Sequence, residues 1–168
     1  MAAESGLGFD PRSMLAALDH HRVTYIVIGG LARVIHGADE TTHGVDIVPS
    51  TRTENLRRLD AALQELNAKR PDGAALSLEA SPPTASVIEV ATDQGELKLV
   101  SEPAGTRGYD DLRRAATREP LGHGLRPSVA SAGDLSRMLS ALGRQEDIPK
   151  VLAMRRLAEL EISRGIER

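Results

Sequence analysis

The sequence predicts an α/β (α+β) protein in which helices flank a mixed β-sheet of about four to five strands, with further helices at the C-terminal end. A β-branched run, TYIVIGG, ends in paired glycines, as expected for a buried strand followed by a tight turn. Two later segments, SVIEVAT and ELKLVS, alternate side-chain character with the period of a strand. Before them, TRTENLRRLDAALQEL carries leucines at helical spacing. Predicted helices and predicted strands are therefore interspersed along the chain.

The first three helices are predicted from their end residues. Asp10 caps the start of DPRSMLAALDHH, and LARVIHG forms a short helix closed by Gly37. Thr51 and Glu54 form a capping-box pattern at the start of TRTENLRRLDAALQEL. These signals predict where each helix begins or ends.

The last two helices are likewise predicted from their end residues and apolar spacing. Ser131 and Asp134 indicate a capped start for AGDLSRMLSAL, which Gly143 ends. A further helix covers 148–162. We expect the leucine-rich faces of both helices to lie in the core, including in the second helix the residues Val151, Leu152, Leu157 and Leu160.

Three more strands are predicted from short apolar runs. These are VDIV, stopped by Pro49, then ALSLE at 75–79 and LRPSVAS at 125–131. The intervening stretches KRPDGA and EASPPTA are loops, because proline and glycine punctuate them.

Length and composition limit the classes of protein that need consideration. The 168 residues favour a single domain over 1–168, with a core of about 10–130 and a C-terminal helical part of about 131–168. A net charge of -3 argues against strong nonspecific attraction to nucleic acid, and the scarcity of aromatic residues leaves few stacking platforms. The absence of cysteine excludes disulfides, thiolate nucleophiles and zinc–cysteine sites.

The N-terminal stretch MAAESGLGFDPRS lacks the basic and apolar regions of a secretory signal. No apolar run approaches the length that crosses a bilayer. We therefore expect a cytoplasmic protein that does not contact a membrane.

Three ordered blocks carry a resemblance to a known family. They are IGGLARVIHG…THGVDIVPS, ATDQGELKLVSEPAGTRGYDDLRRA and VASAGDLSRMLSALGRQED. Together they resemble the nucleotidyltransferase superfamily, specifically the small AbiEii/MenT-type proteins related to toxin–antitoxin systems. The resemblance implies two aspartates alternating on the strand after the glycine turn, and a third carboxylate from a neighbouring strand. In such proteins these groups hold two magnesium ions that bind the nucleotide phosphates and activate the attacking hydroxyl.

The carboxylates are where the chain departs from this pattern. Gly29 and Gly30 match the glycine turn, whose backbone N–H groups can approach phosphates closely. Asp46 matches the second aspartate, but Gly44 stands in place of the first. Lys98 stands where the family has its third carboxylate, so the charge at this position is reversed.

A later basic stretch departs as well. Leu139 and Glu146 stand where the family carries lysines, whereas Arg137, Arg144 and Asp147 match. Glu40 replaces the usual basic residue before the first aspartate. Several coordinated changes favour natural divergence over a single engineered inactivation at Gly44. Because about 1.4 kcal/mol already changes a rate tenfold, losing several metal-holding charges leaves little of the usual reaction.

The leading expectation is therefore a degenerate nucleotidyltransferase-fold protein, inactive in two-metal nucleotidyl transfer. It would bind an NTP, an RNA or a protein partner, or form a homo-oligomer. The nucleotide-binding candidates are Gly29, Gly30, Arg137 and Arg144.

The alternative is an active, toxin-like nucleotidyltransferase that moves a nucleotide monophosphate from an NTP to an RNA or protein hydroxyl. It would need Mg²⁺, with Asp46 as the metal ligand. Its catalytic residues would be Asp46, Glu96 and Lys98, since Glu96 has the same strand parity as Lys98.

Two further patterns leave alternatives open. His36, Asp39, Glu40, His43 and Asp46 recur about every three residues, which would suit a metal-dependent hydrolase if the turn-like segment brought them together. A basic cluster around GTRGYDDLRRAATR is either a solvated helix face or a contact patch for RNA or phosphate. That cluster comprises Arg107, Arg113, Arg114 and Arg118.

Overall fold

The computed structural model describes residues 9–73, 76–78 and 87–167. The helices are α2 (Pro11–His20), α3 (Gly29–Ile35), α4 (Thr53–Glu65), α5 (Tyr109–Leu112), α6 (Ala132–Leu142) and α7 (Ile148–Glu167), with a 3-10 turn η1 (Gln145–Asp147) before α7. The strands are β1 (Tyr25–Ile28), β2 (Gly44–Pro49), β3 (Val87–Thr92), β4 (Gly95–Val100), β5 (Thr117–Arg118) and β6 (Ser128–Val129).

The strands form one mixed sheet of six strands in the order β3-β4-β2-β1-β6-β5. Pairs β1/β2, β3/β4 and β5/β6 are antiparallel, whereas β2/β4 and β1/β6 are parallel. The predicted α/β class with a mixed sheet and C-terminal helices is confirmed. The sheet has more strands than the four to five expected, because β5 adds a two-residue edge strand that no sequence pattern indicated.

Two strand predictions need correction. Within the predicted strand 75–79, Leu76 to Leu78 form no strand, and the rest of that segment lies outside the described residues. Leu78 nevertheless is 1% exposed, so its apolar character reflects packing in the core rather than pairing in the sheet. The predicted strand 125–131 shortens to Ser128–Val129.

The helix ends confirm most of the predicted caps. The Asp10 carboxylate accepts the Ser13 N–H at 3.1 Å, and the Ser131 hydroxyl accepts the Asp134 N–H at 3.0 Å. Gly143 closes α6 in the left-handed conformation, with φ 64°. The prediction of a capping box at Thr51 is wrong. Helix α4 begins at Thr53, so its N-cap residue is Arg52, and no side chain caps it by a hydrogen bond. The expected partner of Thr51, Glu54, instead pairs with Arg58 at 2.6 Å.

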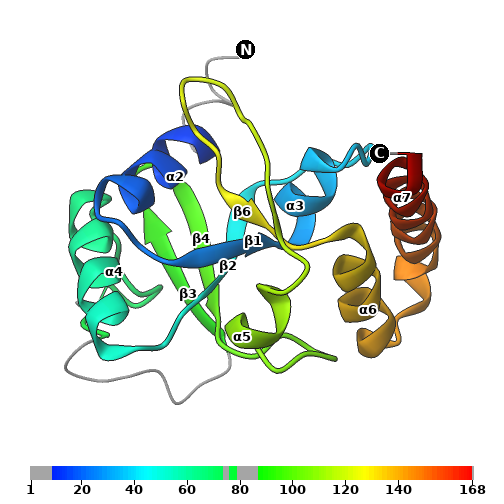
Figure 1. Ribbon diagram of the computed structural model, residues 1–168. Helices are drawn as coiled ribbons and strands as arrows, with labels where there is room; N and C mark the ends of the chain where they lie inside the picture. The colour runs from blue at the N-terminus through cyan, green and yellow to red at the C-terminus, as the bar shows by residue number, and fades with distance from the viewer. Residues whose placement is uncertain (1–8, 74–75, 79–86, 168) are drawn as a thin grey trace, which may run out of the picture.

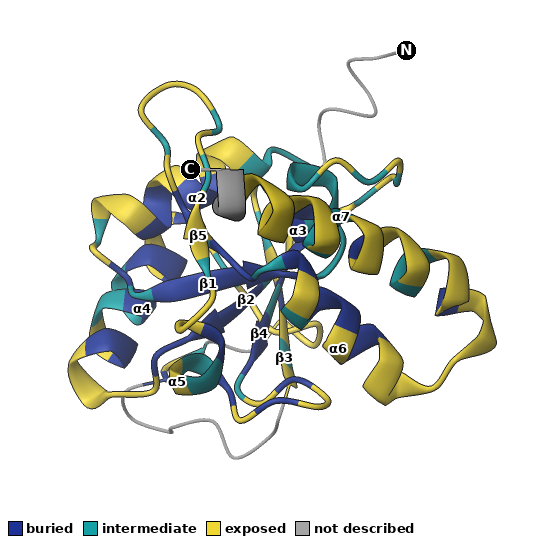
Figure 2. Ribbon diagram, turned by 45° about the vertical axis from the view of Figure 1, so that its right-hand side comes forward, coloured by how far each residue is buried: buried dark blue, intermediate teal, exposed yellow. Residues whose placement is uncertain are grey.

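One face of the sheet is apolar and is covered by helices. Val45, Ile47 and Leu97 point to this face and are fully buried, because side chains alternate along β2 and β4. Figure 1 shows α2 and α4 side by side against the sheet, while α6 and α7 lie at its other side. In Figure 2 the central strands β1, β2 and β4 are mostly buried, whereas β3, β5 and the outer surfaces of the helices are largely exposed. No described helix is long and apolar enough to span a membrane.

A buried asparagine joins three segments at the N-terminal end of β1. The Asn55 amide oxygen accepts the Thr24 N–H at 2.7 Å. The Asn55 amide nitrogen donates to the carbonyl oxygens of Thr24 at 2.9 Å and Ser50 at 2.7 Å. Asn55 therefore ties α4 to the start of β1 and the end of β2.

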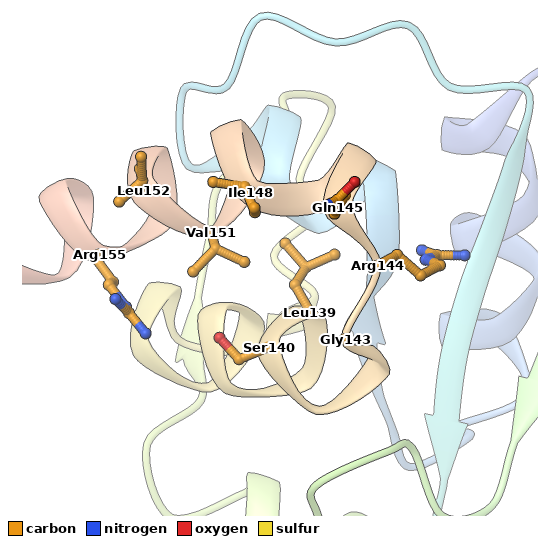
Figure 3. Close-up of a pocket in the computed structure, with 9 residues that line it drawn as sticks. All are labelled: Leu139, Ser140, Gly143, Arg144, Gln145, Ile148, Val151, Leu152 and Arg155. Carbon is orange, nitrogen blue, oxygen red and sulfur yellow. The ribbon is translucent and has the colours of Figure 1, made fainter.

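The two C-terminal helices pack as a hairpin and are only partly core. Figure 3 shows Leu139 of α6 and Val151 of α7 pointing toward each other beside a hollow of about 350 Å³, while Leu152 points away. Leu152 is 57% exposed and Leu160 is 47% exposed, so the prediction that these leucines lie in the core is wrong. The inner face of α7 is built instead around Met154, which is fully buried.

Candidate functional site

The polar face of the sheet brings four predicted positions together. In the register of β2 and β4, Gly44 lies opposite Glu96 and Asp46 lies opposite Lys98. In β3, Glu89 lies opposite Lys98, and its Oε1 is 3.7 Å from the Lys98 Nζ. Since partners in neighbouring strands point to the same face, Asp46 and Lys98 project side by side. Lys98, which stands where the resembling family has a carboxylate, therefore lies beside Asp46 and not on a remote surface.

The glycine turn after β1 lies directly against Asp46. Gly29 has φ +71°, and a Cβ placed there would be 2.5 Å from the Asp46 Oδ2. No L side chain fits this position without displacing the carboxylate. The glycine is thus required both for the turn and for the seat of Asp46.

Gly44 is also closely packed. A Cβ built at Gly44 would lie 3.0 Å from the backbone oxygen of Glu96 and 3.3 Å from its Cβ. Both distances are tighter than ordinary van der Waals contact. The strands therefore approach each other closely where the family pattern has its first aspartate.

The Asp46 carboxylate is half-buried and has no hydrogen-bond or ion-pair partner among the described residues. Burial raises the pKa of Asp46, while the positive charges of Lys98 and Arg33 act in the opposite direction and Glu89 adds to the rise. The site thus holds its carboxylate in an environment that disfavours the charged form.

A cleft of about 480 Å³ opens beside Asp46. Its polar end is formed by Gly29, Gly30 and Asp46, with Arg33 and Arg144 nearby. Its other wall is apolar and comes from the sheet edge and from α6, through Val87, Val100, Leu135, Met138, Leu139 and Leu142. A concave site with an apolar wall and a few polar groups at one end is typical of small-molecule binding.

A second cavity of about 250 Å³ adjoins this cleft and shares Gly30, Arg33 and Asp46 with it. Glu96, Lys98 and Lys150 line the second cavity. Asp46 therefore lies where the apolar cleft meets a smaller, charged compartment. Arg33 and Lys150 were missed by the sequence analysis, because only the fold places α3 and α7 beside the strands.

A charged network closes the far side of this compartment. Arg33 donates two hydrogen bonds to Glu40, at 2.7 and 3.0 Å. Lys150 Nζ lies 3.9 Å from both Glu40 Oε1 and Asp147 Oδ1. Asp147 is 2% exposed and accepts from Arg144 Nε at 2.6 Å. The charges of Arg33 and Arg144 are thus largely neutralised, whereas the Lys98 side chain remains 44% exposed.

The structure separates Arg137 from the other nucleotide-binding candidates. Gly29, Gly30 and Arg144 line the apolar cleft, but Arg137 does not. Its guanidinium instead binds Asp111 at 3.2 Å and Asp134 at 3.1 Å, in a separate polar cleft. Arg137 therefore lies outside the cleft beside Asp46, because its place on α6 turns it toward α5.

The proposed histidine–carboxylate metal cluster does not assemble. His36 Nε2 lies 2.8 Å from the Ala130 carbonyl oxygen and Nδ1 lies 3.0 Å from Glu161, while Glu40 is held by Arg33. Among the described residues, the one group of three side chains with metal-ligand spacing is elsewhere: His20, His21 and Glu65. Sequence shows the histidine pair but not its partner, which lies on α4. The alternative of a metal-dependent hydrolase site between His36 and Asp46 therefore finds no support in the described residues.

Comparison with solved structures identifies the architecture. The antibiotic-resistance factor ANT(2'')-Ia matches with a TM-score of 0.58 and 14% identity, over 96% of this chain and 85% of that one. TM1012 of Thermotoga maritima, a protein assigned to the nucleotidyltransferases, matches with a TM-score of 0.54 and 15% identity, over 87% of this chain and 88% of that one. The chain has the nucleotidyltransferase fold. No family model matches the sequence, and no curated protein does so either.

The nucleotidyltransferase fold implies two magnesium ions, and the residues present do not fit them. The compartment around Asp46 holds three carboxylates, Glu40, Asp46 and Glu96, of which Glu40 already binds Arg33. It also holds the cations Arg33, Lys98 and Lys150, which repel a second cation. Mg²⁺ dehydrates reluctantly and depends on well-placed oxygens. Among the described residues, the compartment therefore lacks the carboxylates that would hold a pair of magnesium ions for catalysis.

The raised pKa of Asp46 gives a testable consequence for stability. In the folded protein Asp46 holds its proton to higher pH than in the unfolded chain. Stability from this group therefore falls as the pH rises from the usual carboxyl range through the folded pKa. We expect Asp46→Asn to raise the free energy of unfolding on the order of 0.5 kcal/mol at pH 7. Urea unfolding at neutral and acidic pH measures this, and the gain should shrink on acidification. An equal loss of stability at both pH values would contradict the prediction.

Proposed function

We propose that this chain is a nucleotide-binding protein on a nucleotidyltransferase fold, in which the Lys98 ammonium takes over the neutralisation of phosphate charge from metal ions. The observation that supports this most directly is the register of β2 and β4, where Lys98 lies opposite Asp46. An ammonium is a compact charge that binds phosphate without needing a metal. In this proposal the protein does not carry out two-metal nucleotidyl transfer.

The apolar wall of the cleft supports a nucleotide rather than free phosphate. Met138 and Leu139 are nearly buried and line the cleft opposite the glycine turn. Leu139 stands where the resembling family carries a lysine, so the exchange removes a charge and extends the apolar surface. A base can pack there while the phosphates extend past Gly30 toward Lys98. We also propose the small AbiEii/MenT-type subgroup as its affiliation, on the strength of the three ordered sequence blocks.

Calorimetric titration with each of the four NTPs in EDTA tests the proposal. We expect one or more NTPs to bind without divalent cation, with an affinity that Mg²⁺ leaves unchanged or lowers. Lys98→Ala should weaken this binding about tenfold, equivalent to about 1.4 kcal/mol. Lys69→Ala is the matched control, because Lys69 is an exposed lysine away from the cleft and removes the same charge.

Two results would contradict the proposal. One is the absence of NTP binding in EDTA by the wild-type protein. The other is equal affinity in the Lys98→Ala and Lys69→Ala variants. An equal loss of NTP affinity in both variants would reflect only the removal of one positive charge from the protein.

The competing proposal, an active transferase, has one observation in its favour. Glu96 lines the charged compartment together with Asp46, so two carboxylates from neighbouring strands β2 and β4 are present there. Incubation with labelled NTP, magnesium or manganese, and total tRNA measures transfer directly. Labelling that Asp46→Asn and Glu96→Gln both abolish would establish the enzyme and overturn the inactive assignment.

A further inference from the structure

A polar cleft of about 520 Å³ lies at the opposite end of β1 from Asp46. Tyr25, the first residue of β1, lines it, whereas Ile28 at the other end pairs with Asp46. Three residue steps of a strand separate the two ends by about 10 Å. A ligand in this cleft is therefore distinct from one bound beside Asp46.

Three arginines from separate segments line the cleft. Arg22 follows α2, Arg118 ends β5, and Arg126 precedes β6. All three are exposed, and within the described part of the chain none forms an ion pair or a side-chain hydrogen bond. The cleft contains one acidic residue, Asp19, whose carboxylate accepts the Tyr25 hydroxyl at 2.9 Å. The cleft is therefore positively charged in a protein whose net charge is -3.

The neighbouring arginine cleft has a smaller excess of positive charge. There, Arg107, Arg114 and Arg137 share the surface with Asp110 and Asp111. Asp111 accepts from the Arg107 backbone N–H at 2.9 Å and from the Arg137 guanidinium at 3.2 Å. Two aspartates there offset three arginines in part, and among these three described arginines the Arg137 guanidinium is the one that pairs with a carboxylate of this cleft. The basic cluster expected from the sequence is thus divided, and Arg118 belongs to the cleft with the larger excess.

The backbone at Arg22 adds an independent observation. Arg22 N–H bonds the Asp19 carbonyl and Val23 N–H bonds the Leu18 carbonyl, both at 3.0 Å. This is the Schellman arrangement, in which the residue after the helix is left-handed and is usually glycine. Arg22 has φ 56° at that position. A residue that is unfavourable for the turn therefore occupies the mouth of the cleft.

We propose that this cleft binds the phosphate groups of an anionic ligand, with Arg22, Arg118 and Arg126 as the binding residues. The planar guanidinium donates paired hydrogen bonds that match phosphate oxygens. A bound anion also relieves the mutual repulsion of three neighbouring positive charges. The ligand is either a small molecule that carries a pyrophosphate group or the phosphodiester backbone of RNA, and the chemistry of recognition is the same for both.

The protein contains its own probe for this site. It has no tryptophan and two tyrosines, and both Tyr25 and Tyr109 line the cleft. Tyrosine emission therefore reports on this cleft and not on the one beside Asp46. Titration with inorganic pyrophosphate in EDTA should change the emission saturably. The double variant Arg118→Gln/Arg126→Gln should bind about tenfold more weakly or worse, since each lost charge-assisted pair weakens binding.

Arg22→Gly separates binding from folding. Glycine suits the left-handed position, so this variant should have a higher midpoint of thermal unfolding and yet bind pyrophosphate more weakly. Arg156→Gln is the matched control, since Arg156 is an exposed arginine on α7.

A labelled oligouridylate of about ten nucleotides, followed by anisotropy, distinguishes the two sources of phosphate. For each protein, the slope of the logarithm of the binding constant against the logarithm of the salt concentration is measured. If the oligonucleotide binds and this slope is smaller in magnitude by about 1.4 in the double variant, the cleft binds an RNA backbone. A response to pyrophosphate alone assigns it to a small phosphorylated ligand. The proposal is overturned if neither probe binds, or if Arg118→Gln/Arg126→Gln titrates like the wild type with both probes.

Discussion

Replacing Asn55 by alanine is expected to lower the free energy of unfolding by about 3 kcal/mol. The side chain is 5% exposed, and its amide makes hydrogen bonds to the backbone of Thr24 and Ser50. Its removal leaves two carbonyl oxygens and one N–H without this partner at a buried junction of α4, β1 and β2. Equilibrium unfolding in urea measures the loss.

Two further variants sharpen this prediction. Gln64→Ala, at an exposed position of the same helix, should change stability by less than about 0.5 kcal/mol. Asn55→Asp keeps an acceptor for the Thr24 N–H but places a carboxylate against two carbonyl oxygens, so we expect it to be at least as damaging as alanine. An Asn55→Ala loss below about 1 kcal/mol would mean that water replaces the amide at this junction.

Gly29→Ala is the second change for which we expect a large effect. The added Cβ meets the Asp46 carboxylate at 2.5 Å, and the residue must also keep φ +71°. We expect a loss of about 2–3 kcal/mol in the free energy of unfolding, from the steric conflict and the strained backbone together. NTP binding should fall as well, because relief of the conflict displaces Asp46 from the mouth of the cleft.

A double-mutant cycle separates the two contributions. In the background of Asp46→Ala the carboxylate is gone, so Gly29→Ala should cost only the backbone term of about 1 kcal/mol. The coupling energy between positions 29 and 46 is then about 1–2 kcal/mol. Additive effects would show that the glycine serves the turn alone and that the contact with Asp46 is energetically unimportant.

Local rules predicted the parts of the site that depend on strand parity. Because side chains alternate along a strand, the sequence was sufficient to place Glu96 and Lys98 on one face, and the structure has both on the face that carries Asp46. The caps at Asp10 and Ser131 depend on residues three positions apart and were equally predictable. The assignment of catalytic or binding roles to these residues stays a prediction.

Features that depend on distant segments were not predictable in this way. Asn55 bonds residues 31 and 5 positions away, and Glu65 meets a histidine 45 positions away. Arg137 has the expected basic character, but the carboxylates of Asp111 and Asp134 orient it away from the cleft. The capping box at Thr51 failed because Glu54 had another partner available one helical turn ahead. In each case a competing tertiary or local contact decided the outcome.

The close approach of β2 and β4 at Gly44 limits which side chains this position can accept. A Cβ at this position would lie 3.0 Å from the Glu96 backbone oxygen, so an aspartate there first needs the neighbouring strand to move. The packing of β2 against β4 therefore favours glycine at position 44. The Gly44→Asp substitution alone meets this steric barrier, and the Lys98 ammonium would still repel a metal ion in the same compartment. An acidic side chain at position 44 would therefore need a concerted change in β4 as well as in β2.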